Sequence, residues 1–260
     1  MNDIFMGLPY GFSDFDKVKD KLIPCRAIAR IPENAKTVIS ILFPYYLGEE
    51  FYEKANVSRY AVSEDYHIIT GRLIEKITAS LKEKFPDNVF EPFVDNSPLP
   101  EVRCAVNAGL GVMGINNLFI NEDYGSWVFL GEIVTDRQFD AFKGEISLCA
   151  SCMKCVEACP QKAITGKEII KERCLSYLSQ KKGELDEDTA KKIAQSGCAW
   201  GCDICQIVCP HNKNAKITPI KEFFDTARPV VTKETDIENR AFSWRGKKVI
   251  DRNIDILQGE

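Results

Sequence analysis

The sequence has no run of about 18 consecutive apolar residues, the length that a membrane-spanning helix requires. Its first residues, MNDIFMGLPYGF, also lack the charged segment and apolar stretch of a secretory leader. We therefore expect a cytoplasmic protein that does not associate with membranes. Thiols stay reduced in that compartment, so the eleven cysteines are not expected to form disulfides.

An excess of positive charge is also lacking, because the formal net charge is −4. The chain as a whole therefore has no basic signature of nucleic-acid binding. Lysine and arginine slightly outnumber the acidic residues between positions 149 and 221. This small local excess permits a polyanionic substrate, but it is also ordinary for a solvated surface.

The first half of the chain alternates strand and helix patterns, which predicts an α/β domain with a mixed sheet. Residues 37–43 (TVISILF) form an apolar, β-branched run that predicts a buried strand. Apolar residues then recur at helical spacing from 66 to 81, and we expect Ser63 to cap this helix, with Glu64 and Asp65 in its first turn. Further strands are expected at 89–94, 117–121 and 126–135, and further helices at 101–110 and 248–257.

Nine of the eleven cysteines lie between positions 149 and 209. The first run has the spacing C-x2-C-x2-C-x3-C-P, which is typical of two-cluster bacterial ferredoxins. Three cysteines of such a run bind one 4Fe–4S cluster and the fourth binds the other. A second run, which also ends in Cys-Pro, suits the complementary arrangement. The spacing predicts that one cluster is bound by Cys149, Cys152, Cys155 and Cys209, and that the other is bound in part by Cys159, Cys202 and Cys205.

The second cluster needs one more thiolate, and spacing alone leaves two candidates, Cys174 and Cys198. A pair of zinc sites is the alternative for the whole set, because structural zinc also uses C-x2-C pairs. A zinc site needs only four ligands, so it does not explain the third cysteine of the first run or the Cys-Pro that closes that run. The pattern therefore favours iron–sulfur clusters. We predict a domain boundary near 135, a double-cluster ferredoxin-like domain over 136–215, and a tail over 216–260 that packs back on the body.

Several motifs occur in order along the chain. The first half contains VSRYAVSEDYH (57–67), FVDNSPLPE (93–101), AGLGVMG (108–114) and GSWVFLGEIVTD (125–136). The cysteine-rich part contains RCLSYL (173–178) and GCDICQIVCP (201–210). From about residue 35 to 215, the chain resembles the cobalamin-dependent epoxyqueuosine reductase family. That family catalyses the last step of queuosine synthesis on tRNA and is related to reductive dehalogenases.

The resemblance implies an iron–sulfur oxidoreductase in which residues 1–135 bind cobalamin and two 4Fe–4S clusters deliver electrons to it. The aspartate of the FVD motif is the family's proposed proton donor, which points to Asp95, and Tyr66 is a second candidate near the substrate. Cys174 rather than Cys198 is implied as the last cluster ligand, because the cysteine of RCLSYL is a ligand in the family. Candidate cobalamin contacts in the matching motifs are Ser58, Arg59, Asp95, Gly109, Gly111, Gly114 and Ser126.

Ordinary structural roles remain open for two of these residues. Asp95 precedes Asn96, Ser97 and Pro98, so it can simply be a turn residue. Tyr66 lies on the apolar face of the expected helix, so it can be a buried aromatic.

The chain departs from the family pattern at two positions where the family has positive charge. Val102 replaces an arginine, with Arg103 one place later, and Ile115 replaces a lysine. Family members also continue into a C-terminal helical-repeat region that helps hold tRNA. The expected partners are an electron donor of the ferredoxin or flavodoxin type and, less certainly, tRNA. The alternatives are a non-catalytic electron-transfer protein with a partner-docking domain and a cobalamin carrier.

Overall fold

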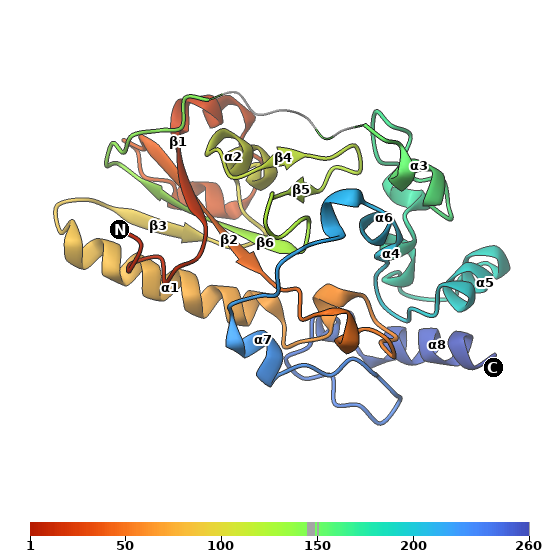
Figure 1. Cartoon of the computed structure of the whole chain (residues 1–260). Coiled ribbons are helices and arrows are strands. Elements are labelled where there is room, and N and C mark those ends of the chain that lie inside the picture. Colours follow the sequence, from red (N-terminus) through yellow and green to blue (C-terminus); the bar gives the residue numbers. More distant parts are fainter. Residues whose placement is uncertain (145–148, 150, 260) are drawn as a thin grey trace. The chain divides into compact units, whose positions relative to one another are not determined.

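A computed structural model describes residues 1–144, 149 and 151–259 (Figure 1). The first part of the chain contains six strands and two helices: β1 (Tyr10–Asp14), β2 (Thr37–Pro44), α1 (Tyr66–Lys84), β3 (Phe90–Phe93), α2 (Glu101–Asn107), β4 (Val112–Met113), β5 (Phe119–Ile120) and β6 (Val128–Thr135). The described residues after β6 form helices only: α3 (Lys154–Ala158), α4 (Leu175–Ser179), α5 (Glu187–Ser196), α6 (Ile204–Ile207), α7 (Lys221–Asp225) and α8 (Lys247–Gln258), with short 3₁₀ turns between them.

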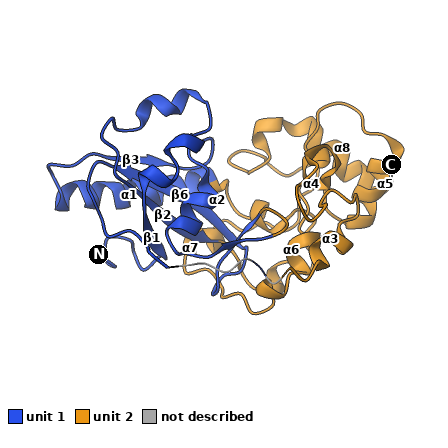
Figure 2. Cartoon of the chain, turned by 90° about the horizontal axis from the view of Figure 1, so that it is seen from above, with its two compact units in different colours: residues 1–44, 67–114, 118–149 blue, residues 45–66, 115–117, 150–260 orange. Residues whose placement is uncertain are grey.

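The chain forms two compact units (Figure 2). Unit 1 comprises residues 1–44, 67–114 and 118–149, and unit 2 comprises 45–66, 115–117 and 150–260. Unit 2 thus includes two short segments from the first half of the chain, which a linear boundary near residue 135 would not assign to it. The tail 216–260 belongs to unit 2. The functional domain limits stay a prediction.

Unit 1 is built on a four-stranded sheet with the order β1-β2-β6-β3. All three pairings are antiparallel, and β4 and β5 form a separate antiparallel pair. The α/β class is confirmed, but these pairings correct the expected mixed sheet in one detail. β2 and β3 both run antiparallel to β6, so they are parallel to each other without being neighbours. This explains why a strand-helix-strand pattern through α1 suggested parallel pairing.

Helices cover both faces of this sheet, which is why all eight residues of β2 are buried. Successive side chains of a strand point to opposite faces. Val38 and Leu42 therefore share one face, where they belong to apolar clusters that include Cys104 and Ala105 of α2. Phe43 points to the other face, where it lies near Ile74 of α1. The expected strand at 37–43 and helix over 66–81 are confirmed.

The start of α1 differs from the expectation. The helix begins at Tyr66, and the hydroxyl of Ser63 donates a hydrogen bond to the carbonyl of Phe223 at 2.6 Å. Ser63 as the N-cap is therefore wrong, because a contact distant in sequence uses its side chain. Strand β1 was not expected, since YGFSD shows no clear apolar alternation.

Unit 2 consists of short helices joined by loops. Helix α5 begins where the Asp186 carboxylate accepts a hydrogen bond from the Thr189 backbone N–H at 2.9 Å, and it ends at Gly197 in the left-handed conformation. Helix α8, expected at 248–257, packs against α5. Its buried Asn253 donates 2.7 Å hydrogen bonds to the carbonyls of Ser179 and Ala199. The C-terminal helix thus holds two loops of the cysteine-rich part.

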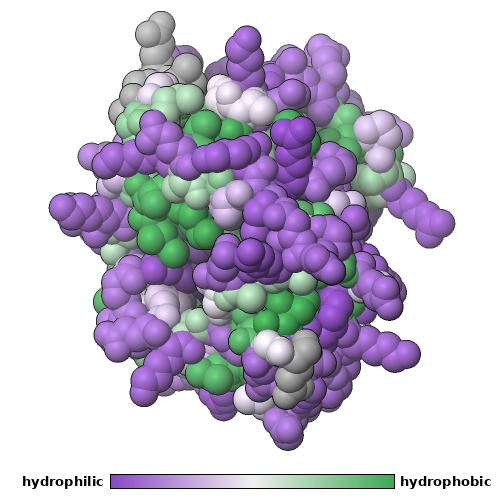
Figure 3. Space-filling view, turned by 90° about the vertical axis from the view of Figure 1, so that its right-hand side faces the viewer, coloured by the Kyte–Doolittle hydropathy of each residue, from purple (hydrophilic) through white to green (hydrophobic). Residues whose placement is uncertain are grey.

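None of the helices in the described part of the chain is long and apolar enough to cross a membrane. The surface in Figure 3 is mostly hydrophilic, and its hydrophobic residues gather in separate patches.

Candidate functional site

Asp95 lies in a strained loop that follows β3. Asp95 and the next residue, Asn96, have φ values of 45° and 36°. Non-glycine residues rarely adopt positive φ, and such strain gathers at functional sites. The Ser97 hydroxyl accepts a hydrogen bond from the Leu99 N–H at 3.0 Å and so shapes the rest of the loop. Asp95 is therefore a turn residue. An ordinary capping role would not require its positive φ.

The Asp95 carboxylate is held on both of its oxygens. Oδ1 accepts a hydrogen bond from the Asn96 backbone N–H at 2.8 Å. Oδ2 lies 2.8 Å from Nε2 of His67 in the first turn of α1. Both side chains are about half exposed, at 50% for Asp95 and 46% for His67. This arrangement can hold a proton between an imidazole and a carboxylate at a point that solvent and substrate can reach.

Asp95 opens into a pocket of about 620 Å³ in unit 1. The pocket is lined by the Asp95 loop, by the start of α2, by Met113 and by residues 23–25. Glu101, the first residue of α2, is part of this lining, and burial together with the Asp95 charge raises its pKa to about 7. Arg103 also lines the pocket and brings a positive charge to it.

Cys25 and Cys104 lie in unit 1, outside the cysteine-rich part of the sequence. Cys104 is fully buried in the apolar cluster beneath α2. Cys25 is only partly buried and lines the pocket beside Asp95.

Several cysteines of unit 2 lie near one another, and their assignment to two clusters stays a prediction. Burial is the main cause that raises the pKa of Cys155, and the thiols of Cys209 and Cys152 add to it. These three thiols are therefore close enough to influence one another. Cys149 lies in the range assigned to unit 1, so its place in this group stays a prediction.

The second group contains Cys174. Burial is again the main cause of the raised pKa of Cys202, to about 11, and the thiols of Cys174 and Cys159 contribute. Cys205 behaves in the same way, with a pKa raised to about 12 by burial and by Cys202 and Cys174. Cys155, Cys174 and Cys205 also pack against the buried Cys159. Several thiols close together suit a 4Fe–4S cluster, whose iron would offset the cost of deprotonating them.

Cys198 is in a different position. Its thiol donates a hydrogen bond to the carbonyl of Trp200 at 3.1 Å, which requires the protonated form. A cluster ligand must be a thiolate. The contact therefore favours Cys198 as a thiol that binds no cluster. Cys198 nevertheless lies close enough to Cys202 for the two to interact electrostatically.

Among the residues that the structure describes, no three His, Cys, Asp or Glu side chains form a group that could hold a single metal ion.

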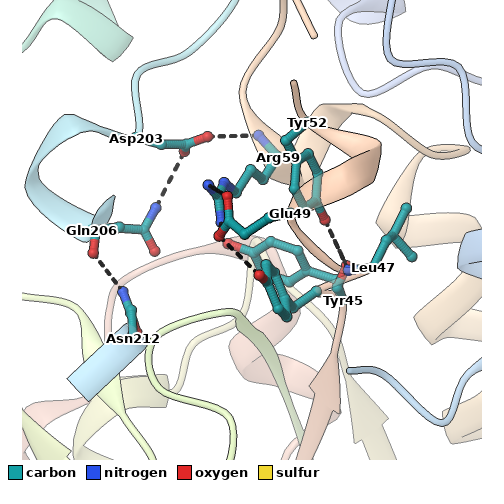
Figure 4. A network of polar contacts seen from close by, with 9 residues as sticks. Tyr45, Leu47, Glu49, Tyr52, Arg59, Asp203, Gln206 and Asn212 are labelled. Atoms are coloured by element: carbon teal, nitrogen blue, oxygen red, sulfur yellow. Dashed lines mark hydrogen bonds and ion pairs between the residues drawn. The ribbon is translucent and has the colours of Figure 1, made fainter. Parts of the chain in front are cut away.

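Arg59, a candidate cobalamin contact, is engaged within unit 2 (Figure 4). Its guanidinium binds both carboxylate oxygens of Glu49, at 2.9 and 2.8 Å, and lies over the rings of Tyr46 and Tyr52. Its backbone N–H donates to Asp203 at 2.7 Å. Because Asp203 directly follows Cys202, this network fixes the 45–59 segment to a cluster loop.

The remaining candidate contacts have internal neighbours as well. Ser58 is buried beside Gly201. A Cβ on Gly109 would meet the ring of Phe142 at 2.6 Å, and one on Gly111 would lie 2.2 Å from the carbonyl oxygen of Ile120. Both glycines are thus required by packing within unit 1. Gly114 and Ser126 are buried.

Tyr66, the second candidate near the substrate, makes an edge contact through its ring with Tyr60 in unit 2.

The two departures from the family pattern are accommodated in apolar surroundings. Val102 packs against a cluster that includes Leu42 and Phe119. Ile115 packs against Cys159 and its neighbours, so an apolar side chain lies next to the cysteine pocket.

One residue of the site, His67, was not singled out from the sequence. It is the last residue of the VSRYAVSEDYH motif and one of only two histidines in the chain. These two features are the ones by which the sequence could have identified it as a site residue. Its pairing with Asp95 spans 28 residues and depends on the packing of α1.

Comparisons with known proteins agree with these observations. Residues 26–96 match the family model of epoxyqueuosine reductase QueG, DUF1730, and residues 148–212 match a 4Fe–4S double cluster binding domain. An epoxyqueuosine reductase of Lactococcus garvieae is 36% identical over 241 residues, which cover 85% of this chain and 68% of that protein. For the Listeria monocytogenes enzyme the identity is 35%, with 84% and 62% covered. The chain thus spans about two thirds of these relatives.

Solved structures point the same way. The epoxyqueuosine reductase of Streptococcus thermophilus superposes with a TM-score of 0.80 at 26% identity, covering 99% of this chain and 81% of that one. An epoxyqueuosine reductase bound to a modified tRNA-Tyr stem loop gives 0.79 at 26% identity, with 96% and 76% covered. A reductive dehalogenase, at 16% identity and a TM-score of 0.50, shares the fold only. The motifs, the cysteine pattern and these matches together show that the chain belongs to the epoxyqueuosine reductase family.

Proposed function

We propose that the protein is an iron–sulfur reductase that reduces an epoxide on a modified nucleoside, with Asp95 as the proton donor. The observation that carries this proposal is the strained Asp95 loop, which holds a carboxylate against His67 beside a 620 Å³ pocket. In a solved structure of a Bacillus subtilis epoxyqueuosine reductase that is 26% identical to this chain, an aspartate-bearing catalytic loop is swung out of the active site. The Asp95 loop is the equivalent candidate here.

The protein's own residues would bind and protonate the substrate. His67 keeps Asp95 oriented and can share its proton, and a carboxylic acid at this position can protonate an oxygen as its bond to carbon breaks. Arg103 at the pocket rim offers a positive charge for a phosphate or a leaving oxygen.

The two groups of cysteines would hold two 4Fe–4S clusters. These clusters supply electrons one at a time, which a carboxylate and an imidazole cannot do. The thiol neighbourhoods of unit 2 support Cys152, Cys155 and Cys209 with Cys149 for one cluster, and Cys159, Cys174, Cys202 and Cys205 for the other. A ferredoxin or flavodoxin is the proposed source of these electrons.

Cobalamin is proposed as the third cofactor on the strength of the family. Arg59, Gly109 and Gly111 are engaged by their own neighbours, so these residues give no independent reason for a corrin. The Ser58 hydroxyl is buried without a hydrogen-bond partner among the described residues. Gly114 and Ser126 remain candidates for contacting it. An ultraviolet–visible spectrum after anaerobic reconstitution with iron, sulfide and hydroxocobalamin tests this directly. Retention of the corrin band after gel filtration is expected, and loss of that band from fully cluster-loaded protein would remove cobalamin from the proposal.

The role of Asp95 is tested by Asp95→Asn, with the exposed Asp87→Asn of the same unit as the control. The asparagine variant is expected to lose turnover by at least about a hundredfold, the usual contribution of a general acid. Its clusters should form normally, because Asp95 lies in unit 1. Turnover that persists in Asp95→Asn would show that another group donates the proton.

A tRNA substrate is proposed from the family, since a relative has been solved with an epoxyqueuosine-modified tRNA stem loop. Binding of such a stem loop should weaken as salt rises, because contacts to phosphates release counterions. Affinity that does not change between two salt concentrations would argue for a smaller substrate. The alternative of a non-catalytic electron carrier is not favoured, because a carrier has no need for the Asp95 pocket.

A further inference from the structure

Two glutamates, the partly buried Glu101 and the fully buried Glu132, lie behind the Asp95 loop and have no assigned role. Glu132 lies in β6, is fully buried, and has no hydrogen-bond partner on either carboxylate oxygen in the part of the chain that the structure describes. An ionised carboxylate in such surroundings would carry a large desolvation penalty. Burial together with the Glu101 charge raises the pKa of Glu132 well above the ordinary value, which favours the protonated acid.

The strand register fixes the direction of the Glu132 side chain. Glu132 pairs with Ser40 of β2 on one side and with Phe93 of β3 on the other. It therefore shares the sheet face of Val38 and Leu42, which is the face covered by α2. Helix α2 presents Glu101 and Cys104 to this region, and burial, with smaller contributions from Glu132 and Glu101, raises the pKa of the Cys104 thiol. The Ser40 hydroxyl is likewise buried without a partner.

Glu101 connects this buried site to the loop. Its carboxylate accepts a hydrogen bond from the backbone N–H of Asp95, and its other oxygen is buried without a partner. Burial and the Asp95 charge raise the pKa of Glu101, whereas His67 lowers it. The Glu101 charge adds to burial in raising the pKa of Glu132. Glu101 also lines the pocket that Asp95 faces. Glu101 thus lies at the pocket beside Asp95, at the start of the helix that covers the sheet face of Glu132.

We propose that Glu101 and Glu132 form a proton-holding pair that returns a proton to Asp95 during turnover. The inference rests on the proposed reductase function. Reduction of an epoxide consumes two electrons and two protons, whether the product is an alcohol or an alkene plus water. The clusters would supply the electrons, and the carbon–oxygen bond would break as Asp95 protonates the oxygen. Glu101 would then protonate Asp95 for the second transfer, and solvent would restore both acids.

Infrared spectroscopy of the full chain with its clusters tests the pair without turnover. A protonated carboxylic acid has a C=O stretching band that a carboxylate lacks. The wild-type protein should show this band at neutral pH and lose most of it in Glu132→Gln, an isosteric change. The exposed Glu75→Gln of α1 should retain it. Absence of the band from the wild-type protein, or its persistence in Glu132→Gln, would overturn the proposal.

Kinetics test the delivery of the proton. Glu101→Gln should lower kcat by about tenfold with KM unchanged, and it should remove the decline of kcat on the alkaline side of the wild-type profile. Glu101→Asp should restore part of the rate, because it restores the acid. An unchanged rate and pH profile in Glu101→Gln would overturn delivery by this residue. If the wild-type protein reduces no substrate, the proposed function fails, and the infrared band still decides whether the pair holds a proton.

Discussion

At the scale of single residues, the chemistry depends on how Asp95 is held. The His67 imidazole lies 2.8 Å from one carboxylate oxygen, and the Asn96 N–H binds the other. Replacing His67 by Gln should lower turnover by on the order of tenfold, because the acid loses its orientation and the partner that shares its proton. Steady-state rates of the cluster-loaded variant measure this. Lys76→Gln on the exposed side of α1 serves as the control, and an equal loss in both variants would contradict a specific role of His67.

A second residue-scale prediction concerns stability and pH. Burial raises the pKa of Glu132, so the folded protein favours its protonated form. The stabilisation that this proton provides is fully present below the ordinary glutamate pKa and is lost as pH rises toward the raised value. Wild-type protein should therefore lose thermal stability relative to Glu132→Gln between about pH 5 and about pH 8. Melting curves by circular dichroism measure the difference, and a constant difference across this range would contradict a buried neutral acid.

The residues also show what a sequence reveals about a site. The cysteine pattern is local, so its spacing was enough to predict the 4Fe–4S double cluster binding domain that residues 148–212 match, although it left Cys174 and Cys198 as alternatives. Asp95 was found through its motif. The sequence did not predict His67 or the glutamate pair as site residues. Their contacts depend on how α1 and α2 pack on the sheet, and residue spacing along the chain does not determine that packing.

At the scale of elements, two glycines make a matched test of the backbone. Gly71 lies in α1 with nothing within 4 Å of a Cβ built on it, whereas Gly111 has the Ile120 carbonyl oxygen at 2.2 Å. Gly71→Ala should raise the free energy of unfolding by about 0.5–1 kcal/mol, because alanine favours a helix. Gly111→Ala should lower it and disturb the β4–β5 pair. The contrast would be contradicted if both changes destabilised the protein equally in chemical denaturation.

Helix α8 carries a prediction about the second cluster. Asn253 joins Ser179, five residues after Cys174, to Ala199, three residues before Cys202. Asn253→Ala leaves the buried Ala199 carbonyl without its donor, which costs on the order of 1–3 kcal/mol, whereas the Ser179 carbonyl still accepts a hydrogen bond from Arg252 at 3.2 Å. We expect lower iron content per chain and a lower melting temperature, while the exposed Lys248→Ala of the same helix should change neither. Full iron loading in Asn253→Ala would show that the cluster loops do not depend on α8.

Elements differed in how well they could be predicted. Strand β2 and helix α1 have long apolar patterns, so their positions followed from periodicity. Strand β1 carries a weak pattern and is defined by its pairing with β2. Ser63 has the residue type of a helix cap, yet a tertiary hydrogen bond uses its side chain. In both cases a partner distant in sequence decided the outcome.

At the scale of the whole molecule, the chain combines two kinds of site in one polypeptide. Unit 1 carries the Asp95 pocket and the buried glutamates, and unit 2 carries most of the cluster cysteines. The family relationship joins these sites into one proposed reaction, in which electrons come from the clusters and protons from carboxylic acids. The division of residues between the units is not linear in sequence, which is why segments such as 115–117 could not be assigned from composition.

Mass spectrometry of the nucleoside gives the most direct test of the reductase. Anaerobically reconstituted protein would be incubated with an epoxyqueuosine-modified tRNA stem loop, hydroxocobalamin and a low-potential reductant. The account predicts conversion of the epoxide by the wild-type protein and none by Cys205→Ser, which lacks a ligand of the second cluster. Unchanged substrate after incubation with wild-type protein carrying both clusters and bound cobalamin would contradict the proposed function.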